Sequence, residues 1–216
     1  MIPKSTASDV GRHRGRLAEI AASLQWDRGR WIWLLCLLGA LDALSALGDG
    51  VRDGLRYDRA ALAAGQWWRL LTAHAVHLDA HHLLLNELGL VLVWALFAQD
   101  YDAIDWCVIL FGGALAISCG LWWLSPRVLW YLGASGLLHT AMAAGTARHL
   151  FDRAWDRWIL LLGLLVKLAH EQYAQATGHA APLIVVDAHL YGAAAGFVIG
   201  AALCGRMAII RRRNTD

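Results

Sequence analysis

Long apolar stretches alternate with short polar segments along most of this 216-residue chain. A helix that crosses the hydrocarbon core of a bilayer needs about 20 predominantly apolar residues. Six stretches approach that length, and each predicts a membrane-spanning helix. The first stretch is short and contains Asp42, so its limits are the hardest to draw. The six predicted spans are residues 31–47, 82–98, 104–124, 133–150, 155–173 and 183–207.

This pattern predicts an all-α fold, that of a polytopic membrane protein with a core of six transmembrane helices. Residues 31–210 would form this membrane domain, residues 1–30 a cytoplasmic N-terminal tail, and residues 211–216 a basic cytoplasmic C-terminal tail. Composition strengthens the prediction, because 58% of the residues are hydrophobic, which exceeds the apolar share of ordinary soluble domains. No clear small-residue cleavage site follows the first apolar stretch, so we expect a span there and not a signal peptide.

Positive charge is distributed unequally between the two sides of the predicted spans. With the N-terminus inside, the inner segments hold most of the 19 Lys and Arg residues, and positively charged loops stay in the cytoplasm. Tryptophans, which prefer the headgroup level, fall at alternating ends of the spans. Both termini are therefore expected in the cytoplasm, and the basic tail is interpreted as a contact with the anionic inner leaflet and not with nucleic acid. The outer segments hold only Arg52, Arg56, Arg59, Arg69 and Arg127.

Polar residues inside the apolar stretches mark candidate functional positions, because such groups are costly in lipid. His82 and Asn86, in the segment HHLLLN, are four residues apart and share one face of the second span. They could form an interhelical hydrogen bond or belong to a site. Ser135 lies between glycines in LGASGLLHT, a setting that by itself is more typical of helix packing than of a nucleophile. The neighbouring outer-loop histidines are expected only to cap or line that loop: His74, His77 and His81.

A third polar position is His189, which heads a stripe of glycines in DAHLYGAAAGFVIG. Glycines at this helical spacing let another helix approach closely. In the alternating topology, the outer ends of the second, fourth and sixth spans meet in one layer, so His189 can reach Ser135 if Gly192 and Gly196 pack on the fourth span. Asp187 lies only two residues before His189, on a nearly opposite helix face, and is not expected to orient it.

These polar groups together have the chemistry that amide hydrolysis requires. A serine becomes a useful nucleophile when a base accepts its proton, and His189 could be that base for Ser135. The developing oxyanion needs hydrogen-bond donors. The backbone N–H of Ser135 at a helix N-terminus is free to donate, and the side chains of His82 and Asn86 could donate as well.

The sequence resembles the rhomboid intramembrane serine proteases. The matching pieces are GASG around Ser135, AHLYGAAAG around His189, HHLLLN, and the pair Trp68–Arg69 in the first outer loop, and they extend over residues 66–200. The resemblance implies a six-helix rhomboid core and a catalytic dyad of Ser135 and His189. It also implies that the first outer loop dips into the outer leaflet and that a mobile fifth span admits the substrate helix sideways.

Within the site, the resemblance implies an oxyanion position built from His82, Asn86 and the Ser135 amide, with Gly133 clearing room for the substrate backbone. Many rhomboids have a tyrosine, which packs on the base, where this chain has His139. This departure leaves open what braces the His189 ring. We expect His139 to line the site and His189 to be the base.

The segments WRLLTAH and GASGLLHT, and the lack of an appended domain, are most similar to the bacterial rhombosortase branch of the family. Rhombosortases process proteins whose C-terminus ends in a Gly-Gly motif, one hydrophobic helix and a basic cluster. The implied partners are the lipid bilayer and the transmembrane segment of a membrane-anchored, secreted substrate. The implied location is the bacterial inner membrane, with the active site opening to the periplasmic side.

Other functions fit less well. A general rhomboid protease for other single-span proteins is the nearest alternative, followed by an inactive rhomboid-like protein that binds membrane helices; such proteins usually lack the serine or the histidine. An intramembrane zinc protease needs HExxH, but Ala174 stands where the second histidine should follow His170 and Glu171. Asp42 and Asp187 have no GxGD motif for an aspartyl protease. No metal or organic cofactor is expected, because the four cysteines form no CxxC pair.

Overall fold

The computed structural model describes residues 31–150, 155–179 and 184–213, and the predicted tail 1–30 lies outside this part of the chain. The described residues form an almost entirely helical protein, which confirms the predicted all-α class. A pair of two-residue strands, β1 (Tyr57–Asp58) and β2 (Trp130–Tyr131), links two loops in antiparallel register. The long helices are α2 (Trp31–Ala46), α6 (Ala80–Phe97), α7 (Ala103–Leu124), α8 (Ser135–Arg148), α9 (Trp155–Ala176) and α10 (Val186–Arg213).

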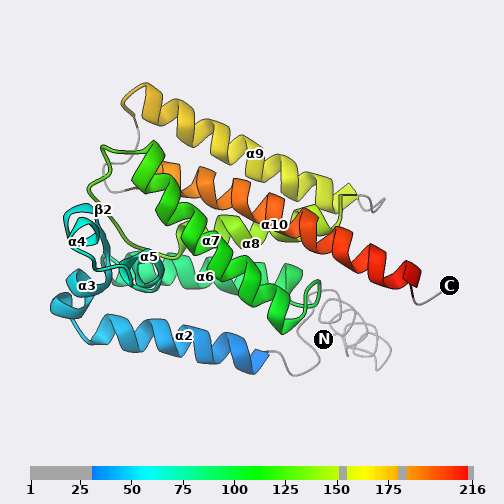
Figure 1. The fold of residues 1–216 in the computed structure, drawn as a ribbon, viewed down its shortest axis with the longest axis horizontal. Helices are drawn as coiled ribbons and strands as arrows, with labels where there is room; N and C mark the ends of the chain where they lie inside the picture. Colours follow the sequence, from blue (N-terminus) through cyan, green and yellow to red (C-terminus); the bar gives the residue numbers. More distant parts are fainter. Residues whose placement is uncertain (1–30, 151–154, 180–183, 214–216) are drawn as a thin grey trace, which may run out of the picture.

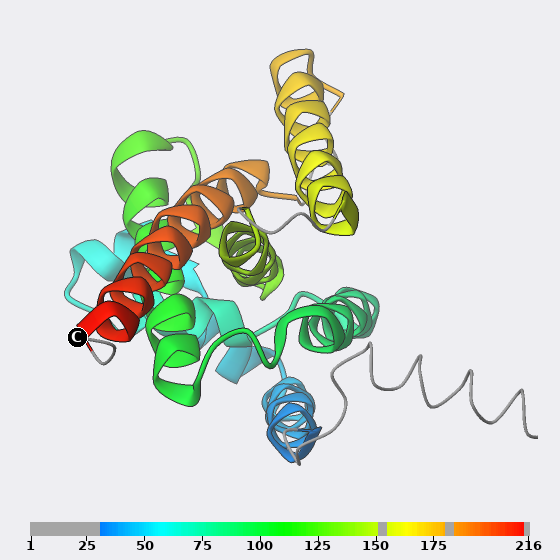
Figure 2. The same cartoon turned by 90° about the vertical axis from the view of Figure 1, so that its right-hand side faces the viewer.

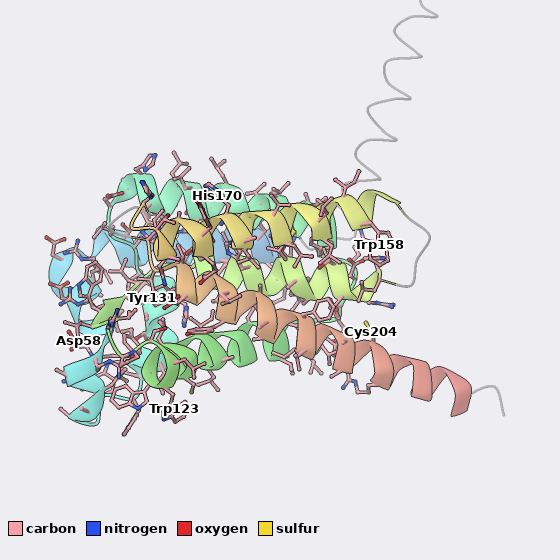
Figure 3. All side chains as sticks on the ribbon, turned by 90° about the horizontal axis from the view of Figure 1, so that it is seen from above. Asp58, Trp123, Tyr131, Trp158, His170 and Cys204 are labelled. Atoms are coloured by element: carbon pink, nitrogen blue, oxygen red, sulfur yellow. The ribbon has the colours of Figure 1, made fainter. Side chains whose placement is uncertain are left out.

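The long helices lie side by side in one bundle, and the short helices gather at one of its ends (Figure 1). These short elements are α3 (Asp49–Leu55), α4 (Arg59–Ala63), α5 (Arg69–Thr72) and the 3-10 turn η1 (Ala73–Ala75). Helix α8 is central, because it packs against α6, α7, α9 and α10, and Figure 2 shows it surrounded when the bundle is viewed from one end. Trp123 and Trp158 lie at opposite ends of the bundle (Figure 3), as the alternating arrangement of tryptophans predicts.

Each predicted span coincides with a helix, whereas a count of six membrane crossings stays a prediction. Among the described residues, three helices are long and apolar enough to cross: Ala80–Phe97, Ala103–Leu124 and Val186–Arg206. A fourth candidate is the pair Trp31–Ala46 and Asp49–Leu55, which is bent by 112°. Helix α8 has 14 residues and is about 21 Å long, shorter than a hydrocarbon core of about 30 Å. Most of α8 is buried in the bundle and needs no contact with lipid.

Helices α8 and α10 approach each other so closely that two positions on α10 have no room for a side chain. A Cβ atom on Gly192 would lie 2.2 Å from the Gly136 carbonyl oxygen, and one on Gly196 would lie 2.0 Å from the Thr140 carbonyl oxygen. Real contacts of this kind are longer by more than 1 Å, so only glycine fits at both positions. The condition under which His189 can reach Ser135, packing of Gly192 and Gly196 on the fourth helix, is therefore met, and this packing sets the depth of His189 beside α8.

Two arginines, the buried Arg69 and the half-buried Arg59, hold the loop between α2 and α6. Arg69 is 7% exposed, and its guanidinium donates to the carbonyl oxygens of Asp53 at 2.8 Å and Arg56 at 2.7 Å. Arg59 donates to the Leu121 carbonyl oxygen at 2.6 Å and so caps the C-terminal end of α7, where the last carbonyls of a helix have no partner of their own. The neighbouring Trp68 is 52% exposed. Insertion of this loop into a leaflet stays a prediction.

Candidate active site

Ser135 and His189 lie at the ends of two helices that the glycine stripe brings together. Ser135 is the first residue of α8, and His189 lies in the first turn of α10. The Ser135 Oγ and the His189 Nε2 are 2.9 Å apart, a hydrogen-bonding distance. His189 is buried and Ser135 is half-buried. The structure therefore brings together the two residues that the sequence predicts as nucleophile and base.

A third residue at this site, Glu171, was missed from the sequence. Its Oε2 lies 2.9 Å from the His189 Nδ1, and its other carboxylate oxygen pairs with the Lys167 ammonium one helical turn earlier. Both residues come from α9. From the sequence, Glu171 is interpreted only as part of an incomplete zinc-binding motif. The signal that could have found it is a Lys and a Glu four residues apart on one face of an apolar helix, since charged groups there need partners.

The contacts of His189 determine which of its ring nitrogens is protonated. An ionised carboxylate only accepts hydrogen bonds, so the Nδ1 that faces Glu171 carries the proton. In the neutral ring, the Nε2 then has a lone pair and can accept the hydrogen bond from the Ser135 hydroxyl. This is the protonation state that a general base needs before it receives a proton from the nucleophile.

His139 braces the His189 ring, which answers the question left open by the sequence. Its ring stacks on the His189 ring with centroids 4.2 Å apart and an angle of 12° between the planes. The His139 Nε2 lies 3.0 Å from the Lys167 Nζ, and because an ammonium only donates, this nitrogen accepts. The Nδ1 then donates to the Ser135 carbonyl oxygen at 2.7 Å. Both nitrogens of His139 have partners, and the ring lies against His189 at the site.

The predicted oxyanion residues lie beside the loop that precedes Ser135. The His82 Nδ1 accepts from the Leu78 N–H at 3.4 Å, which leaves the His82 Nε2 as a donor. This Nε2 faces Gly133, at 2.8 Å from where a Cβ atom of residue 133 would lie. The Asn86 Nδ2 donates one hydrogen to the His82 carbonyl oxygen at 3.0 Å and has a second one to offer.

Gly133 contributes space and backbone shape to this position, and not a donor. Its φ of +113° lies in the left-handed region, which side chains other than glycine rarely adopt. Its N–H donates to the Ala73 carbonyl oxygen at 3.0 Å, and its carbonyl oxygen accepts from the Tyr131 hydroxyl at 2.8 Å. The loop is therefore held in place on both sides, and a side chain on residue 133 would collide with His82.

His74 and His77 are buried, so the expectation that they only cap or line the outer loop is wrong. The His74 Nε2 lies 3.2 Å from both the Ala114 carbonyl oxygen and the Ser118 hydroxyl, and the His77 Nε2 accepts from the Ala134 N–H at 3.4 Å. Burial lowers the pKa of both rings to about 4. Both rings are therefore neutral at neutral pH, and their hydrogen bonds support the loop that leads to Ser135.

Comparison with known proteins identifies the family of this chain. A family model for the Rhomboid domain matches residues 64–206, a range that includes Ser135, His189 and the residues around them. The chain belongs to the rhomboid family. Rhomboids are typically serine proteases that act on membrane-protein substrates in the bilayer. No curated protein matches the chain.

The rhomboid domain has an apolar groove beside the Ser135 site. A cavity of about 430 Å³ opens between α6, α8 and α9. Its walls are almost wholly apolar, and the two strongly polar residues among those that line it are His139 and Lys167. At Gly163 on α9, no neighbouring atom lies within 4 Å of the position that a Cβ atom would take. The groove can therefore hold an apolar segment whose far end reaches the polar network.

The same network is the candidate metal site of this rhomboid domain. The ligand atoms of His139, Glu171 and His189 all lie within 4.8 Å of one another, and two histidines with one carboxylate are a common zinc donor set. However, the Lys167 ammonium contacts both His139 and Glu171, so a metal ion would have to displace it. Lys167 already provides the positive charge at this position.

Asp187 takes no part in the Ser135–His189 contact, as expected from its place on the helix. Its carboxylate accepts from the Ser125 hydroxyl at 2.6 Å and from the Gln175 amide at 2.9 Å. These contacts tie the start of α10 to the ends of α7 and α9. Asp187 thus helps to hold this end of the rhomboid domain together and does not contact His189.

Proposed function

We propose that this rhomboid protein is an intramembrane serine endopeptidase in which Ser135 is the nucleophile and His189 is the general base. The observation that carries the proposal is the 2.9 Å contact between the Ser135 Oγ and the His189 Nε2. A serine hydroxyl at this distance from a neutral imidazole can lose its proton as it attacks a carbonyl carbon. The family match supports the same reaction class.

The reaction would begin when the Ser135 Oγ attacks the scissile carbonyl carbon and its proton passes to the His189 Nε2. The carbonyl oxygen of the substrate becomes an oxyanion, and the tetrahedral intermediate breaks down when His189 returns the proton to the leaving amine. An acyl-enzyme on Ser135 remains. A water molecule, deprotonated by His189, then attacks the acyl carbon and releases the new C-terminus, which restores the Ser135 hydroxyl.

Three donors would stabilise the oxyanion: the Ser135 backbone N–H, the His82 Nε2–H and the free hydrogen of the Asn86 amide. The Ser135 N–H lies at the first position of α8, where a helix has no acceptor for it. Each such donor is worth about 10²–10³ in kcat in other serine proteases. Gly133 would leave room for the substrate backbone between His82 and Ser135.

The apolar groove between α6 and α9 supports sideways access of a membrane-spanning substrate. It is lined by apolar side chains along most of its length and ends at His139, which is stacked on the base. A substrate helix in the groove would stay in a lipid-like environment until its scissile bond reached Ser135. Displacement of α9 would widen the groove, since α9 forms one complete wall.

We assign the substrate to the rhombosortase class, namely secreted proteins with a C-terminal Gly-Gly motif, a hydrophobic helix and a basic cluster. The sequence resemblance in WRLLTAH and GASGLLHT supports this assignment. Residues 31–210 would then form one six-helix domain of a bacterial inner membrane, with both termini cytoplasmic and the site open to the periplasm. The excess of Lys and Arg in the inner segments supports this orientation.

Co-expression with tagged substrates tests the proposal. We expect release of a secreted protein that has a Gly-Gly membrane tail, and loss of release with Ser135→Ala or His189→Ala. Release that persists in either variant would refute the protease mechanism. A second substrate with an ordinary single span tests the substrate class: equal cleavage of both would favour a general rhomboid protease.

An inactive helix-binding protein is separated from the protease by chemical labelling. A fluorophosphonate reacts only with an activated serine, so we expect it to label wild-type protein and not Ser135→Ala. Failure to label the wild type, in detergent conditions where it binds the substrate helix, would favour the passive binding protein.

A further inference from the structure

Glu171 and Lys167 have no role in the mechanism described above, although they touch the residues that perform it. Within the described residues, the Nδ1 of His189 has one side-chain partner, the Glu171 Oε2 at 2.9 Å. We propose that Glu171 is a positioning residue that makes the site a Ser135–His189–Glu171 triad, with Lys167 fixing the carboxylate. This inference rests on the proposed function and extends it.

The first argument is the geometry of the base. His189 must keep its Nε2 unprotonated and aimed at Ser135, and an imidazole with no partner on Nδ1 can exchange tautomers or rotate. A carboxylate on Nδ1 holds one tautomer and one ring orientation, as in the triads of soluble serine proteases. The Glu171 side chain is 17% exposed and that of His189 is 7% exposed, so the bond between them is largely shielded from water.

The second argument is the charge that the reaction creates. When His189 accepts the proton of Ser135, an imidazolium forms inside a membrane domain. Charges interact more strongly in such an environment than in water, because the effective dielectric constant is lower. The Glu171 carboxylate lies against the nitrogen on the opposite edge of the ring and stabilises this imidazolium in the transition state.

The third argument is that the contacts among the site residues form a closed ring. The Ser135 hydroxyl bonds His189, His189 bonds Glu171, and Glu171 pairs with Lys167. Lys167 in turn bonds His139, whose Nδ1 donates to the Ser135 carbonyl oxygen. Each residue in this circuit is held at two points, and the stacked ring of His139 prevents His189 from tilting away. Such a network holds its members more rigidly than separate pairs would.

The triad also links catalysis to the position of α9. Ser135 and His189 belong to α8 and α10, whereas Glu171 and Lys167 belong to α9, the helix that forms one wall of the groove. If α9 moves to admit a substrate helix, Glu171 leaves His189. The base is therefore fully oriented only when α9 packs against α8 and α10 again.

The test compares Glu171→Gln, which keeps the shape of the side chain and removes its charge, with the matched control Gln175→Ala. Gln175 is also on α9 and bonds α10 through Asp187, away from His189. We expect Glu171→Gln to lower kcat by about tenfold or more, since general-base catalysis contributes about 10²–10⁴. KM should change little, because Glu171 does not touch the substrate. Fluorophosphonate labelling of Ser135 should slow in parallel. Gln175→Ala removes a contact between α9 and α10 but keeps the Glu171 carboxylate on His189, so it should lose less than Glu171→Gln in both measurements.

Two further measurements do not depend on that variant. In the wild type, the proton on the His189 Nδ1 should give a low-field proton resonance, the sign of a charge-assisted hydrogen bond, and Glu171→Ala should abolish it. Formate should restore part of the kcat of Glu171→Ala, which a purely structural defect would not permit. Absence of the resonance in the wild type, or a Glu171→Gln protein with unchanged kcat, would overturn the triad.

Failure of the triad can be distinguished from failure of the proposed function. If Ser135→Ala abolishes cleavage while Glu171→Gln cleaves like the wild type, only the triad is wrong. If Ser135→Ala still cleaves, the serine protease mechanism itself is wrong, whatever Glu171 does.

Discussion

Gly196 lies two helical turns below the base, and replacing it with alanine should disable the site without touching any catalytic atom. A Cβ atom at residue 196 would lie 2.0 Å from the Thr140 carbonyl oxygen and 2.7 Å from the Thr140 carbonyl carbon. Both are backbone atoms of α8, so no side chain can rotate to make room. Helix α10 must therefore move away from α8.

The size of this movement follows from the contact distance. Ordinary van der Waals contact begins at 3.4 Å, so a Cβ at 2.0 Å requires a shift of about 3.4 − 2.0 = 1.4 Å. His189 is on the same helix, seven residues and about 10.5 Å away, and would move with it. A shift of this size would stretch the 2.9 Å contact with Ser135 beyond hydrogen-bonding distance. A misplacement of about 1 Å reduces catalysis by about 10²-fold.

The assay is cleavage of a purified substrate in detergent or liposomes, with kcat referred to folded protein. Thermal unfolding should accompany it, because overpacking of this kind destabilises a protein by about 1–3 kcal/mol. Gly205→Ala is the matched control: Gly205 is also on α10, and nothing lies within 4 Å of its Cβ position. Gly200→Ala should be intermediate, since its closest contact would be 2.9 Å. Wild-type cleavage by folded Gly196→Ala would refute the idea that the α8–α10 distance positions the base.

Three other changes should have measurable effects on cleavage. Gly133→Ala should lower kcat by about 10²–10³-fold, the loss expected for one oxyanion donor, because a Cβ there would lie 2.6 Å from the His82 Cε1. His139→Phe should retain the ring stacking, and His139→Ala should not. Because stacking is worth about 0.5–1.5 kcal/mol, cleavage by the alanine variant should be about 2- to 12-fold slower than cleavage by the phenylalanine variant. Lys167→Met and Glu171→Gln should each lower kcat. The fold-decrease in kcat of the double variant should be smaller than the product of the two single fold-decreases, because the two residues form one ion pair.

Each of these effects has an outcome that contradicts it. Gly65 also has a positive φ, of +91°, but nothing lies near its Cβ position, so Gly65→Ala separates backbone strain from the collision with His82. Equal losses at residues 65 and 133 would contradict the steric explanation. Equal rates for the two His139 variants would mean that stacking does not brace the base. Fully multiplicative losses at Lys167 and Glu171 would mean that the two residues act independently.

The positions of the helices and the pair Ser135–His189 could be predicted from the sequence. Apolar stretches indicate helices that are buried in lipid or in a helix bundle, and they locate these helices to within a few residues. The glycines at 192 and 196 also record a close approach, because no other residue would fit there. The order of the spans then puts the outer ends of alternate helices in one layer, which is sufficient to bring a serine and a histidine together.

The number of membrane crossings could not be obtained in the same way. Lipid tails are as apolar as leucine, so an apolar stretch does not distinguish a helix in contact with lipid from a short one buried among other helices. Helix α8 is of the second kind. For the same reason, the sequence could not show that His74 is buried against α7, since a histidine in a polar loop has no periodic pattern to reveal its surroundings.

The sequence by itself determined which helices form, where their polar residues lie, and that Ser135 and His189 share one layer. Only the tertiary structure decided what surrounds the base. Glu171 and Lys167 reach His189 and His139 because α9 packs with that one face toward α8 and α10, and the rotation of a helix about its own axis depends on contacts with its neighbours. The pattern of apolar residues along the chain does not reveal those contacts, whereas the arrangement of the helices in space does.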